Sequence, residues 1–234
     1  MPRLYFIRLT AGHVYLWQDP DGLTLIDTGL PGSAPLIAEA IQQAGYEAAD
    51  LRRVVLTHFH ADHIGSAADI ASWGEVEVLA HHADAPFIRA QAAGPPPDLA
   101  AFEQPIYDQV MSRLPRVPAV PPRIDRELAG GDELGFGDGA MTVAVPGHTP
   151  GSVALYLPRH RVLFTGDAAA RSQDGKVICG LFNVDRAQAA ASFRRLTGLS
   201  VAVACFGHGE PLTEDAGATL DAALLRLPAS RDTP

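Results

Sequence analysis

The sequence predicts a mixed α/β (α+β) domain, in which strand and helix patterns alternate along the 234 residues. Two observations favour this class. The chain opens with short strand-type segments separated by turns, and it then alternates strand patterns with amphipathic helix patterns. Polar residues of the metal-ligand type also repeatedly follow the strand patterns, next to glycine. With 47% hydrophobic residues and no internal linker, the chain is expected to form a single domain over residues 1–234.

The first elements are predicted to form an antiparallel meander. Strand patterns cover residues 4–9, 14–17 and 23–26, and Pro20-Asp21-Gly22 is a turn signal in which glycine can adopt a positive φ. The third strand ends in Asp27-Thr28-Gly29, whose carboxylate either supports a functional site or caps a turn. Apolar residues then follow helical spacing over residues 33–44, and Gly45 ends the pattern.

The next strand pattern, residues 53–56, leads into Thr57-His58-Phe59-His60-Ala61-Asp62-His63-Ile64-Gly65. His58 and His60 are two residues apart, which places them on one side of an extended chain. Asp62 and His63 lie at the start of the following helix, predicted to continue to Ile70, where an anionic side chain is favoured. Imidazole and carboxylate ligands suit zinc, iron or manganese, so this strand-to-helix turn predicts a metal site.

Residues 85–128 differ in composition from the rest of the chain. They contain nine of the 19 prolines, and between the proline clusters apolar residues follow helical spacing: Leu99, Phe102, Ile106, Val110, Met111 and Leu114. Pro105 is expected to split this helix or to start a second one. Long loops with small helices are commonly lids or binding loops, so a lid insertion is predicted at residues 85–128, with residues 95–122 along the substrate pocket. A stiff structural excursion or an oligomer contact is the alternative.

Outside this insertion, the remaining polar candidates follow strand patterns. A strand at residues 76–80 ends in His81-His82, which we interpret as loop residues. A hairpin over residues 132–145 precedes His148, paired strands at 153–157 and 162–164 precede Asp167, and a strand at 201–206 precedes His208. Helices are predicted at residues 185–196 and 214–227. Several loops that meet at one edge of a sheet would bring these residues together.

The turn at residues 58–63 resembles the His-x-His-x-Asp-His signature of the metallo-β-lactamase superfamily. The series His58, His60, Asp62, His63, His148, Asp167 and His208 is similar to the full superfamily ligand set in order, so the resemblance covers nearly the whole chain. It implies an αββα sandwich, in which two mixed β-sheets lie face to face with helices on the outer faces. The strand and helix order is compatible with this fold but does not predict it alone.

The resemblance also implies a ligand assignment. One metal would be held by His58, His60 and His148, the second by Asp62, His63 and His208, and Asp167 would bridge the two. Zinc is favoured for both divalent ions, with iron or manganese as alternatives. Two such metals share a water and lower its pKa, so that a metal-bound hydroxide attacks the substrate with Asp62 and Asp167 as the catalytic carboxylates.

The function implied is that of a metal-dependent hydrolase that cleaves a small ester, thioester or lactone. An iron-dependent oxidoreductase, of the dioxygenase or di-iron type, is the alternative on the same ligand set. True metallo-β-lactamases lack a bridging residue such as Asp167, and hydroxyacylglutathione hydrolases (glyoxalase II) carry a further C-terminal helical domain, whereas 26 residues follow His208 here. Acyl-homoserine lactonases place a tyrosine after the bridging aspartate, where this chain has Ala168-Ala169-Ala170. The chain therefore resembles the glyoxalase II-like branch of small, poorly assigned hydrolases.

Composition limits the partners. The net charge of −9 and the absence of a basic run argue against nucleic acid or an anionic membrane, so a small-molecule substrate is expected, and a homodimer stays open. The segment 85–120 contains few cations (Arg89, Arg113 and Arg116), which favours a neutral or weakly acidic acyl substrate over a phosphodiester. No apolar run of membrane-spanning length and no signal-peptide pattern occurs, and the two cysteines, Cys179 and Cys205, are far apart. These features predict a cytoplasmic protein.

Overall fold

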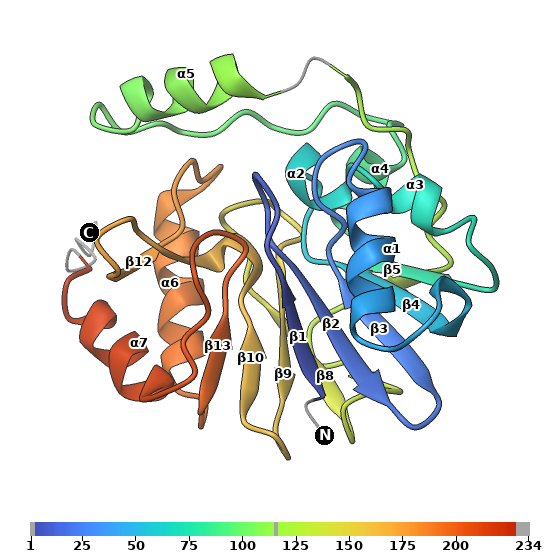
Figure 1. The fold of residues 1–234 in the computed structure, drawn as a ribbon. Helices are drawn as coiled ribbons and strands as arrows, with labels where there is room; N and C mark the ends of the chain where they lie inside the picture. Colours follow the sequence, from blue (N-terminus) through green and yellow to red (C-terminus); the bar gives the residue numbers. More distant parts are fainter. Residues whose placement is uncertain (1–2, 115–116, 228–234) are drawn as a thin grey trace.

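Two β-sheets lie face to face, with helices on both outer faces, in a computed structural model that describes residues 3–114 and 117–227 (Figure 1). Met1 and Pro2, which precede the predicted first strand, and Pro115 and Arg116 of the predicted lid lie outside the described residues. The arrangement confirms the αββα sandwich. Helices α1 and α3 cover one sheet, and α6 and α7 cover the other.

The first sheet has the strand order β1-β2-β3-β4-β5-β6. The meander β1 (Leu4–Ile7), β2 (Val14–Asp19) and β3 (Gly22–Ile26) is antiparallel, as predicted. Helix α1 (Ala34–Gln43) and a 3₁₀ turn, η1 (Ala48–Asp50), then lead to β4 (Leu51–Leu56), which pairs parallel to β3. Strands β5 (Glu77–His81) and β6 (Arg126–Leu128) extend the sheet in parallel.

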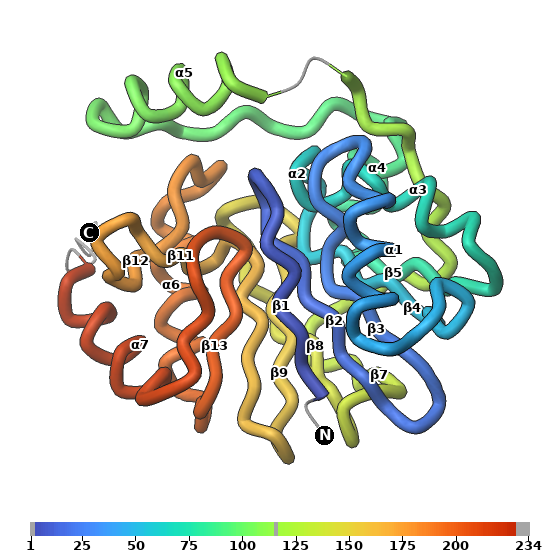
Figure 2. Tube along the Cα trace, in the orientation of Figure 1, coloured from blue at the N-terminus to red at the C-terminus, as the bar shows by residue number. Residues whose placement is uncertain are grey.

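The second sheet has the order β13-β10-β9-β8-β7. Strands β7 (Glu133–Leu134), β8 (Ala140–Ala144), β9 (Val153–Leu157) and β10 (Val162–Phe164) are antiparallel neighbours, and β13 (Val203–Cys205) pairs parallel to β10. A separate hairpin, β11 (Ala169–Arg171) and β12 (Val177–Cys179), follows the 3₁₀ turn η2 (Gly166–Ala168). Figure 2 shows this hairpin beside α6 and α7. Helices α6 (Arg186–Thr197) and α7 (Ala216–Leu224) complete the second half.

Three apolar layers hold the sandwich together. Between the sheets, side chains of both pack in one cluster, including Tyr15 and Ile26 from the first sheet and Leu155 and Phe164 from the second. The outer face of the first sheet packs against α1 and α3, and that of the second against α6 and α7. Burial of these alternating strand faces is the main stabilising contribution, at roughly 25 cal/mol per Å² of apolar surface.

One predicted helix is divided. In place of a helix continuing to Ile70, the chain forms α2 (Ala61–Ile64) and α3 (Ala67–Ile70), separated by Gly65 and Ser66. The break has a tertiary cause: the N–H of Gly65 donates to the carbonyl of Gly29 at 2.8 Å, and a Cβ on Gly65 would lie 2.3 Å from the nitrogen of Pro31, so this backbone packs directly against the β3–α1 loop. Asp62 and His63 still lie in the first turn of α2, as the sequence predicted.

The segment between β5 and β6, which we call the arm (residues 85–125), packs on the first sheet at its two ends, through Ile88 and Ile124, and extends away from the sheet between them. It contains α4 (Ala85–Ile88) and α5 (Gln104–Arg113), and α5 begins with Pro105 in its first turn rather than being split by it. Figure 1 shows the arm crossing above α2, from α4 to α5 and back. Its apolar side chains Phe102, Ile106, Val110 and Met111 are exposed. Within residues 3–114 and 117–227, no helix combines the length and apolarity that crossing a membrane requires.

Candidate metal centre

The structure brings all seven predicted ligand residues to one edge of the sandwich. They lie on the loops and short helical turns that follow four strands, β4 in the first sheet and β8, β10 and β13 in the second. Three overlapping groups have ligand atoms within 4.8 Å of one another: His58, His60 and His148; His58, His63 and Asp167; and Asp62, His63 and His208. The edges of two different sheets therefore contribute to one small volume.

The first group consists of three histidines. The Nδ1 atom of His60 lies 3.1 Å from Nε2 of His58 and 3.0 Å from Nε2 of His148. The ring of His60 is nearly perpendicular to both of the other rings. Three nitrogen lone pairs can therefore point at one position from three directions.

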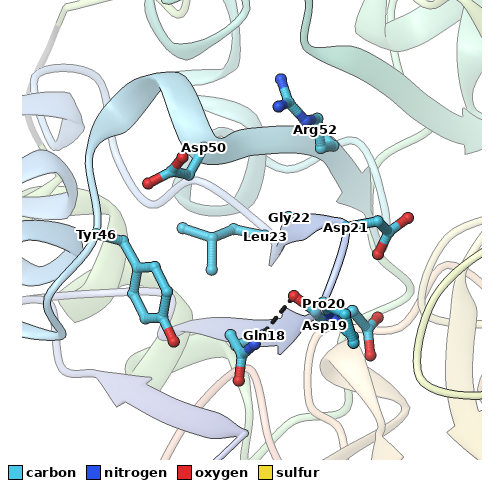
Figure 3. A pocket seen from close by; sticks show the side chains of 9 residues that line it. All are labelled: Gln18, Asp19, Pro20, Asp21, Gly22, Leu23, Tyr46, Asp50 and Arg52. Atoms are coloured by element: carbon cyan, nitrogen blue, oxygen red, sulfur yellow. Dashed lines mark hydrogen bonds between the residues drawn. The ribbon is translucent and has the colours of Figure 1, made fainter.

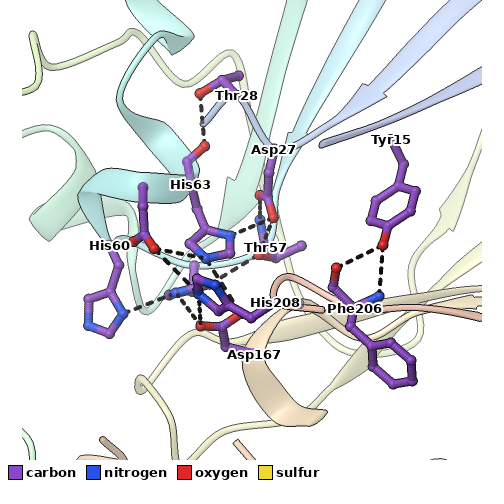
Figure 4. A network of polar contacts seen from close by, with 12 residues as sticks. Tyr15, Asp27, Thr28, Thr57, His60, His63, Asp167, Phe206 and His208 are labelled. Atoms are coloured by element: carbon purple, nitrogen blue, oxygen red, sulfur yellow. Dashed lines mark hydrogen bonds and ion pairs between the residues drawn. The ribbon is translucent and has the colours of Figure 1, made fainter. Parts of the chain in front are cut away.

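The second group contains one carboxylate and two histidines. Nε2 of His208 lies 3.4 Å from Oδ2 of Asp62, and Nε2 of His63 lies 3.9 Å from the same oxygen. Asp167 lies between the two groups: its Oδ2 is 3.6 Å from Nε2 of His148 and 3.1 Å from Nε2 of His208. Figure 4 shows His63, Asp167 and His208 converging on one another.

These residues fit divalent metal ions. Two ligand atoms on one tetrahedral ion, each about 2.1 Å from it, lie about 3.4 Å apart, close to the distances above. Nε2 of His63 and Oδ1 of Asp167 are buried, 3.4 Å apart, and have no hydrogen-bond partner among the described residues. A Cβ on Gly207 would lie only 2.1 Å from this Oδ1, so the position is open because residue 207 is glycine.

Residues around the centre fix the second group. Asp27 accepts a hydrogen bond from Nδ1 of His63 at 2.8 Å and two from Thr57, through its backbone N–H and its hydroxyl, each at 2.8 Å. The carboxylate of the Asp-Thr-Gly turn therefore orients a candidate ligand, as carboxylates beside metal-bound histidines do. Thr28 donates its hydroxyl to the carbonyl of His63, which fixes the start of α2 (Figure 4).

Tyr15 was not singled out in the sequence, although it fixes the loop before His208. Its hydroxyl donates to the carbonyl of Phe206 at 2.8 Å and accepts from the N–H of the same residue at 3.0 Å (Figure 4). In the sequence Tyr15 is one of several aromatic residues in the first strands, and only the tertiary pairing distinguishes it. The backbone of Arg171 in β11 also donates to the carbonyl of His208, so the hairpin supports the same loop.

The two groups differ in charge. Burial lowers the pKa of His58, and burial and His148 lower that of His60 to about 3. Burial likewise lowers the pKa of His148. The Asp167 carboxylate, opposed by burial, raises the pKa of His208 to about 10. Without metal, the first group is therefore neutral at pH 7.

Burial would also lower the pKa of His63, but Asp167, Asp27 and Asp62 together raise it well above its usual value. Burial would raise the pKa of Asp62, yet His63 and His208 hold it below its usual value, and the same two histidines do so for Asp167. The second group without metal is therefore a set of ion pairs between carboxylates and charged imidazoles.

Other singled-out residues lie outside this cluster. His81 is the last residue of β5 rather than a loop residue, and it accepts a hydrogen bond from the N–H of Ala83. His82 follows the strand and contacts the carbonyl of Leu128 in β6, so both have structural roles outside the cluster. Cys179 and Cys205 are free thiols. A hollow of about 240 Å³ at the β2–β3 turn is lined by residues outside the cluster, such as Gln18, Tyr46 and Arg52 (Figure 3).

The arm is attached close to the cluster. Ring centroids of Phe59 and His60 lie 4.7 Å apart, and a Cβ on Gly94 of the arm would lie 2.3 Å from the Phe59 ring. Further along, Glu103 accepts a hydrogen bond from the N–H of Phe182, whose ring contacts Tyr107 of α5. The arm thus contacts the chain on two sides of the candidate centre.

Comparison with known proteins agrees with this fold and site. The family model described as "Metallo-beta-lactamase superfamily" matches residues 7–208. A Bacillus subtilis protein described as "Probable metallo-hydrolase YflN" is 31% identical, over 90% of this chain and 81% of its own length. The chain belongs to the metallo-β-lactamase superfamily. Its relatives include metallo-hydrolases, which supports an enzymatic role.

Three further proteins are similar to this chain. The hydroxyacylglutathione hydrolase of Rhodobacter capsulatus is 28% identical over 86% of this chain, and the match spans 63% of that relative's length. The solved metallo-beta-lactamase family protein TTHA1429 of Thermus thermophilus superposes with a TM-score of 0.70 at 22% identity, covering 96% of this chain and 79% of its own. The Rm3 metallo-beta-lactamase gives a TM-score of 0.70 at 23% identity, over 95% and 89% of the two chains. These structures support the fold alone.

Proposed function

We propose that this protein is a metal-dependent hydrolase that cleaves a small carboxylic ester, thioester or lactone. One observation carries the proposal. Nε2 of His63 and Oδ1 of Asp167 are buried without a hydrogen-bond partner among the described residues, and they face each other amid five further ligand-type side chains. Buried polar atoms are normally satisfied, so such a pair calls for a bound ion.

The proposed ligand sets follow the geometry. His58, His60 and His148 would hold one divalent ion, and Asp62, His63 and His208 a second. Asp167 would contact both, because its Oδ2 faces His148 and His208 while its Oδ1 faces His63. Zinc suits these nitrogen and carboxylate ligands, and iron or manganese can occupy similar sets.

Divalent ions bound there would supply a water of lowered pKa and polarise a substrate carbonyl. The chain's own residues determine the direction of approach. The His208 side chain is 42% exposed, whereas His58 and His63 are nearly inaccessible. Substrate therefore enters from the side of His208. Asp27 keeps the proton of His63 on Nδ1, which leaves Nε2 available as a ligand.

An acyl substrate is supported by aromatic side chains where the arm meets the loops around the centre. Phe59, Phe87, Tyr107 and Phe182 form aromatic contacts between the arm and the loops around the centre. Arg8, close in sequence to the β1–β2 turn, forms an ion pair with Glu210, so its positive charge is balanced within the protein. A hydroxyacylglutathione hydrolase among the relatives also supports thioester chemistry. Apolar walls with a few polar groups are typical of small-molecule sites.

A substrate panel combined with metal analysis tests the proposal. The purified protein is assayed for metal content and for turnover of p-nitrophenyl acetate, an acyl lactone, an acyl thioester and bis-p-nitrophenyl phosphate, with and without chelator. We expect chelator-sensitive turnover of at least one acyl substrate above the phosphodiester. Faster cleavage of the phosphodiester than of every acyl substrate would defeat the substrate class. Tightly held iron with visible absorption and no hydrolysis would favour the oxidoreductase.

Variants test the ligand assignment. His60→Ala and Asp167→Ala should lower bound metal and reduce turnover by several orders of magnitude, while the chain still folds. His160→Ala is the matched control, because His160 lies on the β9–β10 turn and pairs with Asp138. Wild-type metal stoichiometry and rate in either ligand variant would show the assignment to be wrong.

A further inference from the structure

Asp84 is a buried carboxylate that was not singled out in the sequence. It follows β5 and directly precedes α4, and its side chain is completely inaccessible to solvent. Its Oδ2 accepts hydrogen bonds from the N–H of Phe59 at 3.0 Å and from the hydroxyl of Thr149 at 2.6 Å. Its Oδ1 accepts from the N–H of Gly151 at 2.6 Å. All three donors are neutral, and both oxygens of the carboxylate are used.

These donors belong to the two loops that carry the first group of histidines. Phe59 lies between His58 and His60, and Thr149 directly follows His148. One carboxylate therefore joins two loops that come from different sheets. Its contacts are to the loop backbones and to Thr149, which distinguishes it from Asp27, whose carboxylate bonds a histidine ring.

The side chain of Asp84 does not cap the helix that it precedes. Aspartate at a helix N-cap usually accepts a hydrogen bond from the backbone of the first turn, yet Asp84 makes no such bond to α4. Its position is fixed by the backbone instead: its N–H donates to the carbonyl of His81, and its carbonyl accepts from Phe87 and Ile88. A rigid strand end and a helix start thus hold a carboxylate that is directed away from the helix.

The loops are also shaped to receive it. A Cβ on Gly151 would lie 2.7 Å from Cγ of Asp84, so only glycine allows this approach. The hydroxyl of Ser152 lies 2.8 Å from that of Thr149 and accepts from the Thr149 N–H, which orients the threonine toward Asp84. Burial raises the pKa of Asp84 to about 6, while the three hydrogen bonds oppose the rise.

We propose that Asp84 is a positioning residue for the metal held by His58, His60 and His148, acting by fixing the two loops relative to each other. The inference rests on the ligand assignment above. A site of this kind requires its ligands to be held within about 0.5 Å, and neither loop by itself sets the distance between His60 and His148. Asp84 sets that distance from a third element, the junction of β5 and α4. The arm begins at the next residue.

The test compares metal affinity at the two sites in Asp84→Asn and Thr149→Val. Asparagine can keep its oxygen toward Phe59 and Thr149, but its amide NH₂ then faces the N–H of Gly151. The loop that carries Gly151 therefore loses this hydrogen bond to residue 84. Thr149→Val keeps the shape and removes one donor. Metal-free protein is titrated with zinc, and with cobalt to follow each site by its visible absorption.

We expect Asp84→Asn to weaken the three-histidine site about 10- to 100-fold and to change its cobalt spectrum, with a smaller change at the Asp62 site. Thr149→Val should show the same selectivity with a smaller effect, and the double variant should be less than additive. Asp215→Asn, at the exposed start of α7, is the matched control and should change neither site.

A purely structural role would lower the unfolding temperature but leave the ratio of the two affinities unchanged, and that result would overturn the proposal. If Asp84→Asn does not fold, Thr149→Val decides the question by the same ratio. Loss of zinc from His60→Ala but not from Asp84→Asn would leave the proposed function intact and reject the role of Asp84. Absence of zinc, iron and manganese binding in the wild-type protein would instead reject the proposed function.

Discussion

The charge difference between the two ligand groups predicts that metal binding releases protons from one group and not from the other. Metal can bind His63 and His208 only at a nitrogen that has lost its proton. The pKa of His208 is raised to about 10 and that of His63 well above its usual value, so both are protonated at pH 7. The histidines of the first group have lowered pKa values and are already neutral.

The expected release from the protein's side chains is close to two protons for the pair of metals, and ionisation of a metal-bound water would add to it. The His208 side chain is 42% exposed, and solvent screening therefore weakens the effect of Asp167 on it. If screening halves the rise from 6.5, the pKa of His208 is still roughly 8, and more than about 90% of it is protonated at pH 7. Each released proton changes the apparent affinity about tenfold per pH unit, or about 1.4 kcal/mol.

Metal affinity should rise with pH, because protons and metal compete for the same histidine nitrogens. Affinity at the Asp62, His63 and His208 site should rise about hundredfold per pH unit between pH 6 and 7. Affinity at the three-histidine site should be nearly constant over the same range. The carboxylates of Asp62 and Asp167 contribute no proton, because their pKa values are lowered.

Isothermal titration calorimetry of the metal-free protein measures this number. Zinc is titrated at pH 7 in two buffers of different ionisation enthalpy, and the difference in heat gives the protons released per metal. His60→Ala, which lacks a ligand of the neutral group, should keep the release, while His208→Ala should lose about one proton. Equal pH dependence at both sites, or a total below one proton, would refute the reasoning.

Three other predictions concern residues around the centre. Gly207→Ala should lower metal content severalfold, measured by elemental analysis, because the new Cβ would lie 2.1 Å from Oδ1 of Asp167. Tyr15→Phe should lower the free energy of unfolding in urea by about 1–3 kcal/mol, since both backbone groups of Phe206 lose a buried partner. Replacing residues 95–122 by a short linker should change KM or substrate preference more than metal content; loss of metal in parallel would reject a lid role for the arm.

Local patterns predicted the elements that depend on local chemistry. The β1–β3 meander follows from strand alternation and the Pro20-Asp21-Gly22 turn, and α6 begins where Asp185 caps it by accepting from the N–H of Gln188. Neighbouring residues determine these elements, so they can be predicted from the sequence. The four residues of the 58–63 turn were recognisable for the same reason, because they are adjacent.

Features that depend on tertiary contacts were not predictable in this way. The break between α2 and α3 results from the packing of Gly65 on the β3–α1 loop, and β6 forms only because β5 offers it an edge. Asp84 precedes Ala85-Pro86, a typical helix start, and so suggests a simple N-cap. Its bonds to Phe59 and Thr149 are visible only once both loops are in place.

If the proposed assignment holds, the division of the ligands between two sheets makes the stability of the protein depend on the supply of metal. His58, His60, Asp62 and His63 follow a strand of the first sheet, and His148, Asp167 and His208 follow strands of the second. On the proposed assignment, a bound ion fastens one sheet to the other, and the unfolded chain has no equivalent site. Free metal at 100 times its dissociation constant then adds about 2.7 kcal/mol to stability for each ion. A cell short of metal would hold a more easily unfolded chain, and proteolytic turnover would remove the inactive form first.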